Sequence, residues 1–209
     1  MDLPKSVAGK PAAPWSASEA LRGRNLFVLG STGFVGKVLL SMLLDRYPDI
    51  GRAYVMVRRG SGTDSEARFW QSVVTSPAFD PLRDRYGGQD GLAAVLRQKV
   101  VVVDGDITEP NLGLSESEAQ KITQDIDVLI NSSGRVTFNP PLESALRTNV
   151  EGTKNVIAFA KRMKRPALVH TSTCASSASW RIRAAPSALS AISCSTEKCV
   201  PVSSARFGK

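Results

Sequence analysis

The stretch Gly30-Ser31-Thr32-Gly33-Phe34-Val35-Gly36 follows a short apolar run, Leu26–Leu29, and precedes a segment with helical periodicity. A strand, a glycine-rich turn and a helix, in that order, are the context in which such a turn binds dinucleotide phosphates. Gly30 permits the tight turn, Gly33 lets the backbone approach a pyrophosphate, and Gly36 lets the helix pack closely on the strand. The stretch therefore predicts a nucleotide site, with a purely structural turn as the alternative.

The composition is that of one soluble globular domain. The chain has 209 residues, of which 42% are hydrophobic and 22% charged, and this length allows a sizeable core. The first five residues contain no apolar region of a signal peptide, and no apolar run approaches the roughly 18 residues that a membrane span needs. We therefore expect a cytoplasmic location, without a transmembrane segment.

The residues that usually bind metals are few and scattered. The chain has one histidine, His170, and three cysteines at 174, 194 and 199 that form no C-x-x-C pair, so no metal site is predicted. Half of the formal charge of +8 comes from residues 175–209. Because no basic stripe with interleaved aromatic residues is present, a nucleic-acid partner is not expected, and a phosphorylated cofactor or coenzyme-linked substrate explains the charge equally well.

Apolar segments alternate with helical patterns along the chain, which predicts an α/β fold with a Rossmann-like, doubly wound parallel sheet. The four valines of the third segment suit a strand covered on both faces. The expected strands are 26–29, 53–57, 99–103, 127–130 and 167–170. The expected helices are one after the glycines, a polar segment after the second strand, 119–123, and 142–163, with a loop over 76–81. The positions expected to face inward are Val35, Val38, Leu39, Met42 and Leu43 in the first helix, and Leu146, Val150, Val156, Ile157 and Ala160 in the last.

Three parts are expected in the chain. Residues 1–20 are rich in proline and alanine and are predicted to form a loose leader, and residues 21–174 form the Rossmann-like domain. Residues 175–209 form an irregular tail rich in Ser, Ala and Arg, without strand or helix periodicity. The sheet is therefore expected to be incomplete at the C-terminus.

The second strand ends in Arg58-Arg59, about where NAD-preferring domains carry an acidic residue that holds the ribose 2′-hydroxyl. Guanidinium groups pair with a 2′-phosphate, which a carboxylate would repel. The two arginines favour NADPH over NADH as the cofactor, and two solvated arginines at a strand end are the alternative.

Several separate segments resemble the NAD(P)-binding domain of fatty acyl-CoA reductases, also called male-sterility proteins, which are related to thioester reductase domains. The resemblance runs from about Leu21 to Cys174, and Leu29 departs from it, since the family often has Thr there. The segments are Gly30–Gly36, Val57–Arg59, Ser76–Asp80, Gly105–Leu114, Val136–Phe138, Asn149–Thr153 and His170–Thr173.

The resemblance implies NADPH-dependent reduction of a fatty acyl thioester, acyl-CoA or carrier-bound, to an aldehyde or alcohol. It implies that Asp106 and Ile107 flank the adenine, although Asp106 could instead cap a helix or form a turn. Ser132, Ser133 and Gly134 would let backbone approach the cofactor, or form a simple turn.

Asn149 would have a structural or water-relay role near the site, or lie on the surface. Thr173 would be the catalytic hydroxyl that polarises the substrate carbonyl, with Ser172 as its neighbour, although both could simply end a strand. His170 is expected to pack within its strand.

Reductases of this superfamily also use a Tyr and a Lys in a Y-x-x-x-K arrangement after this strand. The chain's tyrosines, Tyr47, Tyr54 and Tyr86, all precede Thr173. We therefore expect a catalytically incomplete chain, truncated or frame-shifted after Cys174. A non-catalytic NADP-binding module and a fragment of a sugar-nucleotide epimerase or dehydratase are the alternatives.

Overall fold

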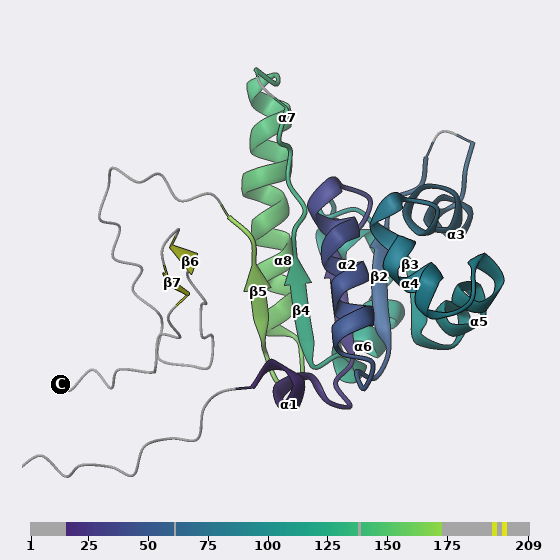
Figure 1. Ribbon diagram of the computed structural model, residues 1–209. Helices are drawn as coiled ribbons and strands as arrows, with labels where there is room; N and C mark the ends of the chain where they lie inside the picture. Colours follow the sequence, from purple (N-terminus) through teal and green to yellow (C-terminus); the bar gives the residue numbers. More distant parts are fainter. Residues whose placement is uncertain (1–15, 61, 138, 173–193, 196–197, 200–209) are drawn as a thin grey trace, which may run out of the picture.

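Five parallel strands form one sheet in the order β3-β2-β1-β4-β5 (Figure 1). The computed structural model describes residues 16–60, 62–137, 139–172, 194–195 and 198–199. The chain leaves β1 for β2 and β3 on one side and returns for β4 and β5 on the other, so the sheet has a topological switch point between β1 and β4. The strands are β1 (Leu26–Leu29), β2 (Ala53–Val57), β3 (Val100–Asp104), β4 (Val128–Asn131) and β5 (Leu168–His170).

Helices cover both faces of the sheet, as the alternation of segments predicts. Two short strands, β6 (Cys194–Ser195) and β7 (Lys198–Cys199), form a separate antiparallel pair. The helices are α1 (Ala17–Leu21), α2 (Phe34–Arg46), α3 (Ser65–Arg68), the π-helix η1 (Phe69–Val74), the 3₁₀-helix η2 (Pro77–Phe79), α4 (Asp80–Arg85), α5 (Gln89–Lys99), the 3₁₀-helix η3 (Pro110–Gly113), α6 (Glu116–Asp125), α7 (Leu142–Leu146), the π-helix η4 (Arg147–Glu151) and α8 (Gly152–Lys161).

The side chains of β1 alternate between two buried clusters, one on each face of the sheet. Leu26 and Val28 pack with α2 and the helices between β2 and β3. Phe27 and Leu29 pack with α6 and α8, where Phe159 lies 5.8 Å from Phe27 between ring centroids. All four β1 residues are buried, which makes β1 the rigid support of the glycine turn that follows it.

The predicted fold class is confirmed, while several boundaries and one strand environment differ. The third strand is an edge strand and is mostly half-buried, so the prediction that its valines are covered on both faces is wrong. The fourth strand includes Asn131. In the segment 76–81, expected to be a loop, Ser76 caps η2, and residues 77–81 form η2 and the start of α4. The helix α5 was not predicted.

The inward face of α2 was predicted only in part. Val35 and Met42 are exposed by 54% and 41%, whereas Leu40, Leu43 and Leu44 are buried.

The predicted long helix after residue 142 consists of α7, η4 and α8 in succession. Figure 1 shows that α7 extends beyond the carboxyl ends of the strands. Val156 and Ala160 in α8 are buried as predicted, but Leu146 and Val150 are 47% and 41% exposed. Those two inward assignments are wrong because the helix extends past the last residue of the strands there.

Part of the predicted leader is ordered, since residues 17–20 belong to α1 and Ser16 caps this helix by accepting a hydrogen bond from the Glu19 N–H at 3.4 Å. Thr173 and Phe138 lie outside the described residues. Within the described part of the chain, no helix combines the length and apolar character needed to cross a bilayer.

Candidate cofactor-binding site

The glycine turn has the backbone geometry that its sequence predicts. Gly30 has a φ of +87°, which favours glycine, and a Cβ on it would lie 2.6 Å from the Ser132 carbonyl carbon. A Cβ on Gly36 would overlap the Gly30 carbonyl oxygen, whereas one on Gly33 would meet that oxygen at 3.4 Å. Gly30 and Gly36 therefore build the turn, and Gly33 leaves its outer side open.

The first turn of α2 offers free donors at this opening. Gly33 is the N-cap and contributes no side chain, and among the described residues no backbone acceptor is found for the N–H groups of Phe34, Val35 and Gly36. An uncapped helix N-terminus behind a glycine turn suits a phosphate or pyrophosphate. The arrangement therefore fits the pyrophosphate of a dinucleotide cofactor.

The remaining residues of the turn differ in exposure. Ser31 is buried, and its hydroxyl donates to the Met56 carbonyl at 3.3 Å, which ties the turn to β2. Thr32 is half-buried, while Phe34 is 84% exposed.

The loop after β4 forms the other wall of the turn. The Ser132 N–H and hydroxyl both donate to the Leu29 carbonyl, at 3.0 and 2.9 Å. The Ser132–Ser133 peptide thereby lies directly against Gly30. Gly134, the last of the predicted small residues, is exposed.

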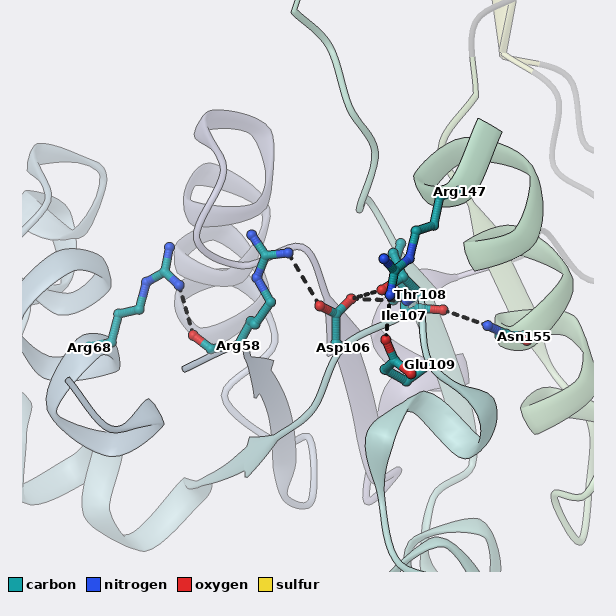
Figure 2. A network of polar contacts seen from close by, with 8 residues as sticks. All are labelled: Arg58, Arg68, Asp106, Ile107, Thr108, Glu109, Arg147 and Asn155. Carbon is teal, nitrogen blue, oxygen red and sulfur yellow. Dashed lines mark hydrogen bonds and ion pairs between the residues drawn. The ribbon is translucent and has the colours of Figure 1, made fainter. Parts of the chain in front are cut away.

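Both arginines at the end of β2 are paired with carboxylates. Arg58 Nη1 lies 3.2 Å from Asp106 Oδ2 (Figure 2), and Arg59 pairs with Asp104 at the end of β3. Their side chains are still 67% and 74% exposed. The Ser65 hydroxyl donates to the other oxygen of Asp104 at 2.6 Å.

A third guanidinium, which the sequence reasoning missed, joins this group. Arg68, at the end of α3, donates from Nη1 to the Arg58 carbonyl at 2.7 Å (Figure 2). Among the described residues it forms no ion pair. Its position in a helix that Asp64 caps, ten residues after Arg58, is the only sequence signal that could have indicated it.

Asp106 forms a turn as well as an ion pair. Its Oδ1 accepts from the N–H and the hydroxyl of Thr108, each at 2.9 Å. Partial burial acts to raise its pKa, but the hydrogen bonds from Thr108 and the charge of Arg58 outweigh burial, so the pKa of Asp106 is lowered. The turn-forming role considered for Asp106 is therefore real, and the carboxylate is held ionised beside Arg58.

Ile107 connects this loop to the helices on one face of the sheet. Its side chain is buried, and a Cβ on Gly152 at the start of α8 would lie 2.9 Å from its Cδ1. Its carbonyl accepts from Asn155 Nδ2 at 2.9 Å, and Arg147 pairs with Glu109 at 2.7 Å (Figure 2). The loop after β3 is thus fixed from α8 and η4.

Asn149 forms two hydrogen bonds to the backbone of the loop after β4. Its Oδ1 accepts from the Arg135 N–H at 2.7 Å, and its Nδ2 donates to the Arg135 carbonyl at 3.1 Å. Its side chain is thus engaged with the loop that carries Ser132, Ser133 and Gly134.

The end of β5 brings His170 and Ser172 to the same edge as the glycine turn, because all five strands run parallel. Ser172 is exposed, and Thr173 lies outside the described residues. We expected His170 to pack within its strand, but its side chain is exposed. The reason is that, in the described chain, no strand pairs with β5 on its outer side. Its Nδ1 lies 3.0 Å from Asn131 Nδ2, a buried partner that sequence reasoning also missed.

In the part of the chain that the structure describes, no group of three or more His, Cys, Asp or Glu side chains is arranged to hold a metal ion. The polar groups at the carboxyl edge include backbone donors, hydroxyls and guanidiniums, and the carboxylates of Asp104 and Asp106 there are paired with Arg59 and Arg58. Such donors suit a phosphorylated organic ligand.

The parallel sheet, its switch point and the glycine turn define a dinucleotide-binding domain. The family described as "Male sterility protein" matches residues 28–193. The chain therefore belongs to the male sterility protein family, and it carries the family's NAD(P)-binding domain.

Curated relatives agree with this assignment. The chain is 33% identical over 159 residues to fatty acyl-CoA reductase 1 of Rattus norvegicus, covering 76% of this chain and 29% of that protein. It is 32% identical over 145 residues to the chloroplastic fatty acyl-CoA reductase 2 of Arabidopsis thaliana, covering 69% and 23%. The chain thus spans about a quarter of the length of these relatives.

Solved structures show the same fold. The terminal R domain of the myxalamid PKS-NRPS pathway matches with a TM-score of 0.57 and 30% identity, over 73% of this chain and 35% of that one. The reductase (R) domain of a non-ribosomal peptide synthetase from Mycobacterium tuberculosis matches with a TM-score of 0.52 and 26% identity, over the same shares.

Proposed function

We propose that this chain supplies the NADPH-binding part of a reductase that converts fatty acyl thioesters, acyl-CoA or carrier-bound, to aldehydes or alcohols. The glycine turn against the uncapped N-terminus of α2 is the observation that carries the cofactor assignment. The relatives that are named fatty acyl-CoA reductases support the substrate class.

The charges at the ends of β2 and β3 support NADPH rather than NADH. Arg58, Arg59 and Arg68 bring three positive charges, and Asp104 and Asp106 bring two negative ones, which leaves the group with one net positive charge. Arg68 supplies this excess and is held by a backbone carbonyl, so it can turn toward a phosphate without breaking an ion pair. A 2′-phosphate would therefore find there a cation that no carboxylate among the described residues neutralises.

When bound, the cofactor supplies a hydride. The chain's own residues would hold its phosphates on the N–H groups of Phe34 to Gly36 and orient its adenosine end between Arg58 and Ile107. The hydroxyl of Ser172, or of Thr173, would donate a hydrogen bond to the thioester carbonyl oxygen and stabilise the charge that develops there.

The positions of the tyrosines favour a second candidate, a non-catalytic NADP-binding module. The phenol of Tyr54 donates to Asp125 at the end of α6 at 2.5 Å, and Tyr47 and Tyr86 pack against the buried cluster that contains Leu26. All three are engaged elsewhere, so none of them supplies the proton that carbonyl reduction needs.

The two candidates are separated by measuring binding and turnover on the same protein. Titration with NADPH and NADH, followed by cofactor fluorescence, tests the cofactor assignment, and NADPH consumption with palmitoyl-CoA tests the reductase. Tighter binding of NADPH with turnover supports the reductase, and binding without turnover supports the module. Absence of binding to both cofactors would refute both candidates.

The expected cytoplasmic location is tested by imaging a tagged chain.

A further inference from the structure

The loop that walls the glycine turn depends on one buried amide. Asn131, the last residue of β4, has no exposed surface, and its strand is otherwise apolar. Burying an amide is costly unless its polar atoms are hydrogen-bonded. Here Oδ1 accepts from the Ser133 N–H at 3.0 Å and from the Ser133 hydroxyl, and Nδ2 contacts His170 Nδ1 at 3.0 Å.

The peptide that Asn131 holds is the one against which Gly30 packs. A Cβ on Gly30 would lie 2.6 Å from both Ser132 C and Ser133 N. From the other side, the Ser132 hydroxyl donates a hydrogen bond to the Leu29 carbonyl. The peptide is therefore fixed from β1 by Leu29 and from β4 by Asn131, and a shift of it would move the turn that receives the cofactor phosphates.

The hydrogen bonds also define the protonation state of His170. Because two Ser133 donors occupy Asn131 Oδ1, the amide N–H₂ must face His170, and Nδ1 must accept. This requires a neutral imidazole with its proton on Nε2. A protonated imidazole would present a second donor to the amide, and turning the amide over would present its N–H₂ to the Ser133 N–H.

The neighbouring strand in the described part of the chain is compatible with this neutral state. Strand β4 is the one strand that pairs with β5 in the described chain, and it carries no titratable side chain. The Asn131 carbonyl accepts from the Thr171 N–H at 2.9 Å, which fixes the two strand ends together. Partial burial lowers the pKa of His170 and so keeps the ring neutral near neutral pH.

We infer that Asn131 is a positioning residue of the cofactor site, which holds the Ser132–Ser133 peptide against Gly30 and loosens it when His170 is protonated. The inference rests on the proposed cofactor binding. It assigns to His170 a control of cofactor affinity rather than a role as a base.

The test is NADP⁺ affinity as a function of pH in variants of the whole chain. Asn131→Leu keeps the branching at Cγ but loses both hydrogen bonds from Ser133, so we expect about tenfold weaker binding at about pH 7.5. His170→Asn places an amide oxygen opposite Asn131 Nδ2 at every pH. At about pH 7.5 this variant should bind NADP⁺ like the wild type. By about pH 5.5 the wild type should bind about fivefold more weakly, and the variant should not show this loss of affinity.

Asn25→Leu is the matched control. Asn25 joins segments at the opposite edge of the sheet, accepting from the Arg52 N–H at 2.7 Å and donating to the Asp125 carbonyl at 3.0 Å. Its loss should lower thermal stability and leave NADP⁺ affinity and its pH dependence unchanged. The 2′-phosphate of NADP⁺ titrates equally in all variants, so only differences from the wild type are compared.

Two results would overturn the inference. One is a folded Asn131→Leu variant with wild-type affinity, and the other is a His170→Asn variant with the full acid-side fall. If the wild type bound no NADP⁺ at all, the proposed function would fail, and amide hydrogen exchange of Ser133 would decide the positioning role. Protection in the wild type and exchange at least about tenfold faster in Asn131→Leu support it, and equal rates refute it.

Discussion

Gly36 lies so close to the carbonyl oxygen of Gly30 that a side chain on Gly36 would overlap that oxygen. The contact joins the start of α2 to the end of β1 and gives the turn between them its shape. Gly33 lies between the two in sequence but has ordinary space around it. The three glycines of the turn therefore have separable roles in folding and in binding.

Exchanging the glycines one at a time separates these roles. Gly36→Ala should lower the free energy of unfolding by about 3 kcal/mol, because backbone must move to admit the methyl group. Gly33→Ala should cost less than about 1 kcal/mol, since its φ of −78° suits alanine. It should nevertheless weaken NADPH binding about tenfold, because its methyl group would stand where a phosphate approaches.

Thermal unfolding and cofactor titration of both variants check this prediction. Equal losses of stability in the two variants would contradict the division of roles, and so would unchanged NADPH affinity in Gly33→Ala.

Arg68→Met should reduce selectivity for NADPH over NADH. The change removes a positive charge that forms no ion pair among the described residues, at the end of α3 beside Arg58, and keeps the aliphatic part of the side chain. We expect about tenfold weaker NADPH binding, the equivalent of one charge-assisted hydrogen bond, with NADH affinity within about twofold. Arg24→Met is the control, because Arg24 pairs with Asp127 at 3.0 Å at the amino edge of the sheet. Parallel loss of NADPH and NADH affinity in Arg68→Met would refute a 2′-phosphate role.

The glycine turn was predictable because its requirements are local. The positive φ of Gly30 and the short spacing to Gly36 are properties of seven consecutive residues. Arg58 was predictable as a strand-end residue, but its pairing with Asp106 joins residues 48 positions apart. Arg68 and Asn131 were missed because their partners are set by the packing of α3 on β2 and of β5 on β4.

Burial was harder to predict than secondary structure. The periodicity of residues 142–163 is the same whether a helix lies on a sheet or rises beyond its edge, so Leu146 was placed inward although it is 47% exposed. Likewise, four consecutive valines cannot distinguish a central strand from the edge strand β3. Both errors concern the position of an element in the fold, which its own residues do not encode.

The carboxylate of Asp106 should contribute to stability in a pH-dependent way. Its folded-state pKa lies below the ordinary value of 3.8, so the ionised form stabilises the fold above that value, and the contribution is lost as pH falls through the lowered folded-state pKa. Asp106→Asn should therefore lower stability at neutral pH and flatten the loss of stability below about pH 4. Thermal unfolding between neutral and acidic pH measures this, and parallel pH profiles for the two proteins would contradict it.

The aromatic pair across β1 and α8 should dominate one of the two cores. Phe159→Ala removes a buried ring that contacts Phe27 and should cost about 4 kcal/mol. Phe34→Ala, at a residue 84% exposed, should change stability by less than about 0.5 kcal/mol. Chemical denaturation of both variants checks the contrast, which would be refuted by similar midpoints.

Three exposed apolar residues on the projecting helix should make the isolated chain self-associate. Leu142, Leu146 and Val150 recur every four residues on α7 and η4 and are 72%, 47% and 41% exposed. Contiguous exposed apolar surface of this kind promotes association. Replacing all three by Gln should lower light scattering at high protein concentration severalfold. Stability should change little, because Gln is a good helix former and all three side chains belong to the exposed class. Ser144→Gln with Thr148→Gln on the same helix is the control and should leave scattering unchanged. If the triple variant scattered as strongly as the wild type, another part of the chain would drive the association.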